Sequence, residues 1–181
     1  MKETIFISGT PCVGKTTVSE VLSEKLNCRL IKINELAIEN DFVLGIDKEK
    51  GYKIIDIGRL NTKINEIIAD YNELLVFEGH LAHLCDGADK LIILRLHPDI
   101  LKERLSSRNY SPAKIRENLE AEAIGICASE AYELYGQKVN EIDVSNLDIG
   151  DIIPLLENII FNEKYYPVGE VDFMDWLISN P

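Results

Sequence analysis

The chain has 181 residues, of which 46% are hydrophobic and 28% are charged, so it is long and apolar enough to bury a full core and is not a disordered protein. A formal net charge of −12 argues against broad nucleic-acid binding, because a protein that neutralises phosphates needs a basic surface, and no sequence-specific binding is expected. The four cysteines form no C-x-x-C pair and no apolar run approaches the length of a membrane span, so we expect one cytoplasmic domain over 1–181, with reduced thiols and no membrane contact.

Predicted strands and helices alternate along the chain. Runs of apolar or alternating residues predict strands at 4–7, 29–33, 74–77, 90–96 and 139–144. Helical spacing of apolar residues predicts helices at 17–26, 35–40, 56–71, 99–107, 113–135, 151–160 and 171–178. The polar stretch 41–53 is predicted to be a loop. This order indicates an α/β fold with a parallel five-stranded sheet and helices on both faces, in which sites lie at the carboxyl ends of the strands.

Residues 9–16, Gly-Thr-Pro-Cys-Val-Gly-Lys-Thr, match the phosphate-binding loop (P-loop) pattern, in which four residues separate a Gly from Gly-Lys-Ser/Thr. The segment follows a predicted strand and precedes a predicted helix, which is the context that this loop requires. Lys15 is then expected to stabilise charge in the transition state, and the Thr16 hydroxyl to ligate Mg²⁺. We predict ATP binding by the following residues of the segment: Gly9, Pro11, Cys12, Val13, Gly14, Lys15, Thr16 and Thr17.

Other P-loop classes do not fit the sequence. GTPases read guanine with Asn/Thr-Lys-x-Asp, but Asn61-Thr62-Lys63 is followed by Ile64 and Asn65, and no transporter-type Ser-Gly-Gly motif occurs. Small-molecule and nucleotide kinases remain, and these need an acceptor-binding segment, expected near 34–60, and an arginine-bearing lid. Arg104 and Arg108 are four residues apart on one helical face, and arginines suit the charge that develops in phosphoryl transfer. We therefore predict a lid near 104–118.

These motifs together give a more specific resemblance. The chain contains Gly-Thr-Pro-x-Val-Gly-Lys-Thr-Thr at 9–17, then Glu78-Gly79-His80, then Arg104-Leu-x-x-Arg108-x-Tyr110, with Lys114-Ile115-x-Glu117-Asn118 after it. Over residues 3–160 it resembles the adenylate kinase family that is nuclear in eukaryotes and cytoplasmic in archaea. The resemblance implies a nucleoside monophosphate kinase-like fold, Mg²⁺-dependent conversion of ATP and AMP to two ADP, accompanying ATPase activity, and a role in maturation of the small ribosomal subunit through a basic ribosomal protein.

The resemblance also implies roles outside the P-loop. Glu78 is expected to hold Mg²⁺ through water or to orient a water, and His80 to activate water for hydrolysis. Lid residues Arg104 and Arg108 are expected to be catalytic. Further ATP contacts are expected from Arg108 and Lys138, and AMP contacts from Asn34, Arg59, Gly79 and His80. The family often has an Arg after a Leu-Ala pair, where this chain has Ile38, so Arg59 is left as the only obvious arginine on the acceptor side. An acidic C-terminal extension, near 161–181, resembles archaeal members.

Three functional hypotheses stay open at this stage. The first is an adenylate kinase that also hydrolyses ATP. The second is an assembly ATPase with little kinase activity, whose hydrolysis releases a bound ribosomal protein. An acidic protein surface would steer such a basic partner toward it. The third is a kinase for another small acceptor.

Overall fold

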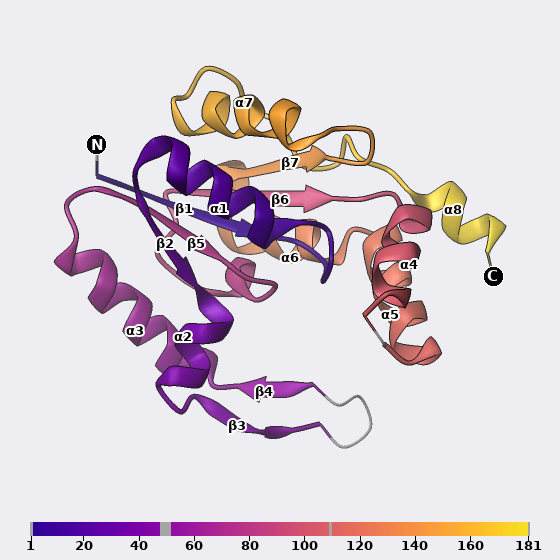
Figure 1. Ribbon diagram of the computed structural model, residues 1–181, viewed down its shortest axis with the longest axis horizontal. Coiled ribbons are helices and arrows are strands. Elements are labelled where there is room, and N and C mark those ends of the chain that lie inside the picture. The colour runs from indigo at the N-terminus through magenta and orange to yellow at the C-terminus, as the bar shows by residue number, and fades with distance from the viewer. Residues whose placement is uncertain (1, 48–51, 109, 181) are drawn as a thin grey trace.

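The computed structural model describes residues 2–47, 52–108 and 110–180, and a five-stranded parallel sheet forms its centre (Figure 1). The strand order is β2-β5-β1-β6-β7. These strands span Glu3–Ser8 (β1), Arg29–Lys32 (β2), Leu74–Glu78 (β5), Lys90–Arg95 (β6) and Val139–Asp143 (β7). Every neighbouring pair is parallel, with Phe6 beside Phe77 and Ile7 beside Ile92. The predicted α/β fold and five-stranded parallel sheet are therefore confirmed.

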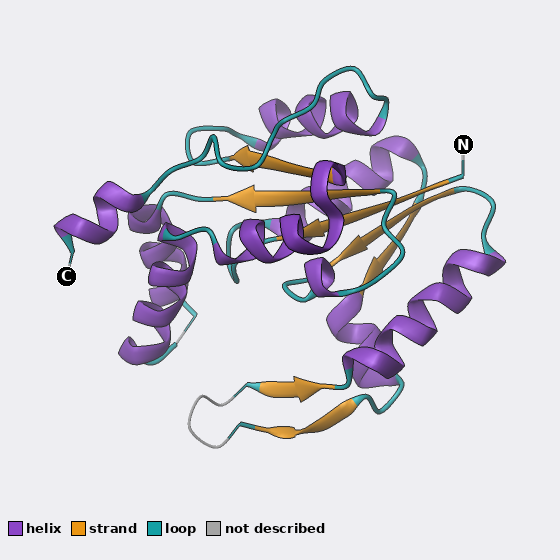
Figure 2. Cartoon of the chain, turned by 180° about the vertical axis from the view of Figure 1, so that it is seen from behind, coloured by secondary structure: helices purple, strands orange, loops and turns teal. Residues whose placement is uncertain are grey.

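Helices cover both faces of the sheet (Figures 1 and 2). One face packs on α1 (Lys15–Leu26) and α7 (Ile149–Ile160), and the other on α2 (Ile33–Glu39), α3 (Ile57–Asp70) and α6 (Ile126–Tyr135). Successive side chains of a strand point to opposite faces, so Ile5 and Ile7 join the first core and Phe6 joins the second. β5 and β6 consist largely of consecutive apolar residues because both faces of these strands are buried.

Further helices lie beyond the carboxyl ends of β6 and β7 (Figure 1). These are α4 (Pro98–Ser106), α5 (Pro112–Ala123) and the C-terminal α8 (Met174–Ser179). The Trp176 indole of α8 donates to Asp99 Oδ1 at 2.7 Å, which ties the end of the chain to α4. Two short 3₁₀ turns, η1 (Ala82–Leu84) and η2 (Gly136–Lys138), precede β6 and β7 respectively. None of the helices in the described ranges combines the length and the hydropathy that crossing a membrane requires.

Two predicted elements are corrected. The predicted loop 41–53 contains β3 (Val43–Ile46) and the first residue of β4 (Lys53–Ile55), which pair antiparallel as a hairpin, and the β-branched Val43, Ile46, Ile54 and Ile55 favour strands. Residues 48–51 lie outside the described part. The predicted long helix 113–135 is two helices, α5 and α6, with Gly125 between them at φ +68°. A left-handed glycine cannot continue a right-handed helix, so the chain changes direction there.

Candidate active site

The P-loop connects the end of β1 to the start of α1. Gly9 has φ +139°, and a Cβ added to it would lie 2.5 Å from the carbonyl oxygen of Leu94 on β6, so this position requires glycine. Cys12 and Gly14 also have positive φ, 69° and 113° respectively. The loop therefore winds tightly over the carboxyl edge of the sheet and delivers Lys15 as the first residue of α1. Helix N-termini of this kind attract phosphate groups.

The ammonium group of Lys15 lies against the loop that precedes it. Nζ donates to the carbonyl oxygens of Gly9 at 2.8 Å and Thr10 at 2.9 Å, and the residue is only 8% exposed. Burial lowers the pKa of Lys15, while the neighbouring Glu78 carboxylate opposes that shift. A cation held at this point can stabilise negative charge on a phosphate placed at the loop.

Thr16 and Glu78 form a pair of oxygen donors beside Lys15. The Thr16 hydroxyl donates to Glu78 Oε1 at 3.2 Å, and Glu78 is 7% exposed at the carboxyl end of β5. Burial raises the pKa of the Glu78 carboxyl, and the charge of Lys15 counteracts this rise. A hydroxyl and a carboxylate at the same edge of the sheet are the ligand types that Mg²⁺ prefers, so the residues present fit this ion.

Two lid arginines face the loop from α4 and the residues after it. Arg104 Nη1 donates to the carbonyl oxygens of Cys12 at 3.3 Å and Val13 at 3.1 Å. Arg104, Ser107 and Arg108 line a cavity of about 280 Å³ together with Cys12, Gly14, Lys15, Thr16 and Thr17. The structure thus brings the predicted lid arginines to the predicted phosphate-binding residues. Asn109 of the predicted lid lies outside the described residues.

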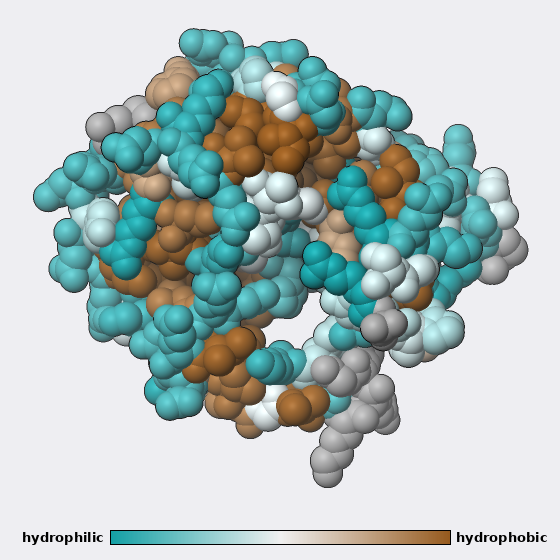
Figure 3. Space-filling model, viewed as in Figure 1, coloured by the Kyte–Doolittle hydropathy of each residue, from teal (hydrophilic) through white to brown (hydrophobic). Residues whose placement is uncertain are grey.

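A larger cavity of about 530 Å³ continues from the P-loop toward the β3–β4 hairpin. Figure 3 shows the corresponding hollow between the hairpin side of the molecule and the α4–α5 side. It is lined by the P-loop residues Pro11, Cys12, Lys15 and Thr16, by Glu78, Gly79, His80 and Leu81 after β5, and by Asn34, Tyr52, Lys53, Arg108, Tyr110, Lys114 and Asn118. Lys15, Thr16 and Arg108 line both cavities, so the two form neighbouring compartments of one site.

Several residues of the larger cavity were not predicted. Lys114, from the first turn of α5, lies with Nζ 4.0 Å from the ring centre of Tyr52 and 4.6 Å from that of Tyr110. Lys53 comes from β4, and Asn118 lies one turn beyond Lys114 on α5. The sequence signal for Lys114 and Asn118 was their place in the predicted lid, whereas Tyr52 and Lys53 fell in a stretch without periodicity.

His80 and His83 have different surroundings. His80 lines the larger cavity, and Asn34 Nδ2 lies 3.2 Å from its Nδ1. Burial, together with the charges of Lys15 and nearby cations, lowers the pKa of His80 to about 4, so its imidazole is neutral at pH 7. His83 is buried outside this cavity, bonded to Ser8 Oγ at 2.8 Å and to Glu130 Oε2 at 2.9 Å. Through these bonds His83 joins η1 to β1 and to α6.

Two predicted contacts are not brought to the site. Lys138 lies in η2 before β7, where its Nζ donates to the carbonyl oxygen of Ala88 at 3.3 Å. Residues before a parallel strand lie at its amino end, so Lys138 is at the opposite edge of the sheet from the P-loop. Arg59 stacks on Phe42, 4.6 Å from the ring centre, and donates to the carbonyl oxygen of Asp41 at 3.3 Å. It is not among the residues that line the two cavities.

The P-loop at the carboxyl edge of a parallel sheet, with lid arginines and an adjoining second cavity, defines a P-loop kinase. A model of the AAA domain family matches residues 5–125. A relative from Methanothermobacter thermautotrophicus named "Putative adenylate kinase" is 40% identical over 175 residues, which cover 97% of this chain and 99% of the relative. One from Methanocaldococcus jannaschii with the same name is 36% identical over 160 residues, covering 88% and 87%. The chain belongs to this P-loop kinase family, of the nucleoside monophosphate kinase type.

Solved structures of other kinases share the fold at low sequence identity. Shikimate kinase from Acinetobacter baumannii in complex with shikimate has a TM-score of 0.62 and 14% identity, covering 90% of this chain and 94% of that chain. Thymidylate kinase from Candida albicans has a TM-score of 0.53 and 15% identity, covering 89% and 92%. These two proteins are named for different acceptors, so the likeness shows a common fold and does not identify an acceptor.

Proposed function

We propose that this protein is an adenylate kinase, which transfers the γ-phosphoryl group of ATP to AMP and gives two ADP. One observation carries the proposal: a phosphate-binding compartment and a second, cation-lined compartment share Lys15, Thr16 and Arg108. Donor and acceptor phosphates bound in adjoining compartments would meet beside the same positive charges. Holding two reactants in this way removes most of the entropy cost of their encounter.

The donor side of the site consists of the P-loop and the lid arginines. Backbone N–H groups of the loop and the N-terminus of α1 bind the phosphates, and Lys15 stabilises charge that develops on the transferred group. Arg104 and Arg108 line the same cavity as the P-loop and supply further donors there. Thr16 and Glu78 would hold Mg²⁺, which when bound neutralises phosphate charge and helps to orient ATP.

On the acceptor side, the residues in the cavity suit a nucleoside monophosphate. Lys53 and Lys114 provide positive charge for its phosphate, while Asn34, Gly79 and His80 lie at the wall formed by α2 and the turn after β5. We assign the phosphate contact to these lysines in preference to Arg59, because both lysines line the larger cavity and Arg59 does not. Tyr52 and Tyr110 flank Lys114 and supply aromatic surface for a base or ribose.

The position and charge state of His80 favour ATP hydrolysis as a second activity. A neutral imidazole in the cavity, near Lys15, can orient a water or accept its proton. We propose that hydrolysis accompanies transfer and that it serves maturation of the small ribosomal subunit in the cytoplasm, with a basic ribosomal protein as partner. The net charge of −12 supports a basic partner, and the sequence motifs support the maturation role by resemblance.

Transfer assays with purified protein test this proposal. ATP is supplied with AMP, with each other nucleoside monophosphate, and with small-molecule acceptors in turn. ADP formed in a two-to-one ratio to AMP consumed supports the adenylate kinase. Transfer only to another acceptor would identify a different kinase, and phosphate release without any transfer would identify an ATPase. In the same assay, His80→Gly should reduce hydrolysis more than transfer, and equal losses would contradict the role given to His80.

A further inference from the structure

A buried chain of charged residues runs from the P-loop to the C-terminal segment, and none of its members lines the two cavities of the active site. The Glu122 carboxylate, 1% exposed, accepts hydrogen bonds from the Thr10 hydroxyl, from Arg95 Nε at 2.8 Å and from the Leu96 amide at 3.0 Å. Arg95 is also buried and pairs through Nη1 with Glu141. Burying three charges is costly unless each is paired and hydrogen-bonded, as these are, so their arrangement is tightly fixed.

The contact between Glu122 and Thr10 is connected to Lys15 through the backbone of the P-loop. Thr10 is 3% exposed, and its side chain bonds to Glu122 while its carbonyl oxygen accepts from Lys15 Nζ at 2.9 Å. The adjacent Gly9 carbonyl accepts from the same ammonium at 2.8 Å. Holding the Thr10 side chain therefore fixes the short segment of loop that positions Lys15. The negative charge of Glu122 also acts on Lys15 and favours its protonated form.

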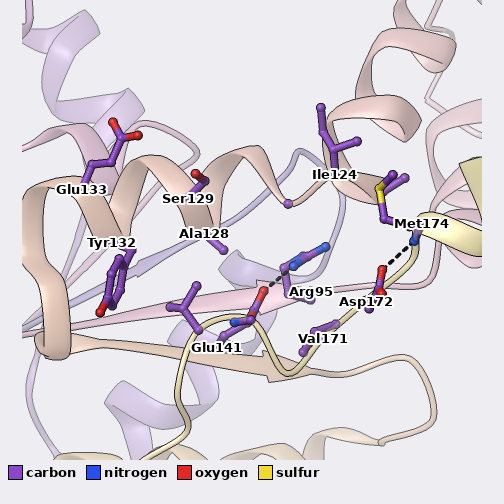
Figure 4. Close-up of a pocket in the computed structure, with 14 residues that line it drawn as sticks. Arg95, Ile124, Ala128, Ser129, Tyr132, Glu133, Glu141, Val171, Asp172 and Met174 are labelled. Carbon is purple, nitrogen blue, oxygen red and sulfur yellow. Dashed lines mark hydrogen bonds and ion pairs between the residues drawn. The ribbon is translucent and has the colours of Figure 1, made fainter.

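Glu122 is also placed at the joint between the lid and the body of the protein. It lies in the last turn of α5, whose first turn carries Lys114, and α5 ends just before Gly125. Arg95 lies directly under this joint, since a Cβ on Gly125 would be 3.1 Å from Arg95 Nη1. Figure 4 shows Arg95 joined to Glu141 beneath the joint, with the segment around Val171 and Asp172 on the same side.

We propose that Glu122 is a positioning residue for phosphoryl transfer. From its place between the lid and the body of the protein, Glu122 holds Thr10 and thereby the part of the P-loop that positions Lys15. Glu122 touches no substrate; it acts through Thr10 on the loop carbonyls. The proposal rests on phosphoryl transfer at the P-loop but does not depend on which acceptor is used.

Thr10→Val tests the contact with little change in shape. It removes the hydroxyl while leaving the Glu122–Arg95 pair intact, and Glu122→Gln removes the carboxylate charge. The matched control is Thr62→Val on α3, where the hydroxyl donates to the Gly58 carbonyl of its own helix. We expect each of the first two variants to lower kcat about tenfold with the KM for ATP within about twofold, because misplacing a catalytic group by about 1 Å costs up to about a hundredfold. The control should behave as the wild type.

The double variant Thr10→Val/Glu122→Gln separates a direct link from general damage. Residues that act as one unit give non-additive losses, so the double variant should be no slower than the worse single variant. Losses that multiply to about a hundredfold, or a Thr10→Val variant with wild-type kcat, would overturn the proposal. Should Glu122→Gln fail to fold by circular dichroism, Thr10→Val alone still decides the question.

Amide hydrogen exchange in the nucleotide-free protein provides a readout that does not need enzyme activity. Peptides that cover residues 9–16 should exchange at least about fivefold faster in Thr10→Val than in the wild type and in Thr62→Val. Unchanged exchange would overturn the role of Glu122. A wild-type protein that does not phosphorylate AMP would instead refute the proposed function, and the exchange result would be unaffected.

Discussion

The two sides of the active site are built in different ways. The donor side comes almost entirely from one continuous segment, the P-loop and the first turn of α1, supported by Glu78 and Arg104 through hydrogen bonds. The acceptor side is assembled from α2, the β3–β4 hairpin, the turn after β5 and the lid. Two of its cations, Lys53 and Lys114, come from separate elements. A donor site of this kind depends on local backbone geometry, whereas the acceptor site depends on how distant elements pack.

The largest effect should come from the donor side. Lys15→Ala removes the buried ammonium beside the loop, and both transfer and hydrolysis should fall by about 10²- to 10³-fold, as for loss of one preorganised charge donor. Steady-state assays of ADP and phosphate formation measure both. The matched control is Lys138→Ala at the opposite edge of the sheet, which should keep wild-type rates. A large loss in the control would show that the donor side extends further than the P-loop.

Loss of Glu78, one of the two residues proposed to bind Mg²⁺, should give the next largest effect. Glu78→Gln keeps the shape of the side chain but removes its charge, so activity should fall by about 10- to 100-fold and the Mg²⁺ concentration for half-maximal rate should rise. Titration of the rate with Mg²⁺ measures this. Glu66→Gln, which lies on α3 and pairs with Lys63, is the control and should leave the titration unchanged. An unaltered Mg²⁺ dependence in Glu78→Gln would exclude Glu78 from metal binding.

Substitutions on the acceptor side should change the KM for the acceptor and leave the KM for ATP nearly unchanged. Lys114→Met should raise the KM for AMP by about tenfold and leave the KM for ATP within about twofold, because a charge-assisted hydrogen bond contributes about 1.5–3 kcal/mol. Arg59→Met is the matched comparison, and we expect it to change neither constant. A larger rise in the KM for AMP in Arg59→Met than in Lys114→Met would indicate that Arg59 binds the acceptor phosphate, and would refute the assignment made from the cavity.

The smallest expected effect concerns the stability of the fold. His80 takes up a proton near pH 6.5 in the unfolded chain but only near pH 4 in the folded protein, where burial lowers its pKa to about 4. Between these values the unfolded chain binds more protons, so acid favours unfolding. From pH 7 to pH 5 the wild type should lose about 2 kcal/mol more free energy of unfolding than His80→Gln. Urea titrations at both pH values measure this, and equal losses would show that His80 titrates normally.

The same contrast explains what the sequence could predict. The P-loop needs Gly9, Lys15 and Thr16 within a few residues of each other, so its chemistry is visible in the sequence. Glu78 was predictable because it ends an apolar strand, whose carboxyl end lies at the active edge. The same rule also places Lys138 correctly: it precedes β7, so it lies at the amino end of a parallel strand, at the edge of the sheet opposite the P-loop.

The acceptor side could not be predicted in this way. Tyr52 and Lys53 belong to a short hairpin without clear periodicity, and their place in the cavity follows from how that hairpin packs. Arg59 occupies a predicted helix, α3, but its orientation is decided by Phe42, which is distant in the sequence. The joint at Gly125 interrupts a pattern that is otherwise typical of one long helix. The places of Tyr52, Lys53 and Arg59 depend on tertiary contacts that no local pattern encodes, whereas the break at Gly125 rests on the conformation of one glycine.

The hairpin that carries Lys53 should make the acceptor side of the site sensitive to temperature. Its strands, β3 and β4, pair with each other and with no further strand in the described part of the chain, and Leu44 and Ile46 are 66% and 62% exposed. A two-stranded ribbon is only marginally stable in water, so warming should fray it before the central sheet loosens. Binding of the proposed acceptor should then weaken with rising temperature sooner than binding of phosphates at the P-loop, so the KM for the acceptor should rise on warming before the KM for ATP does.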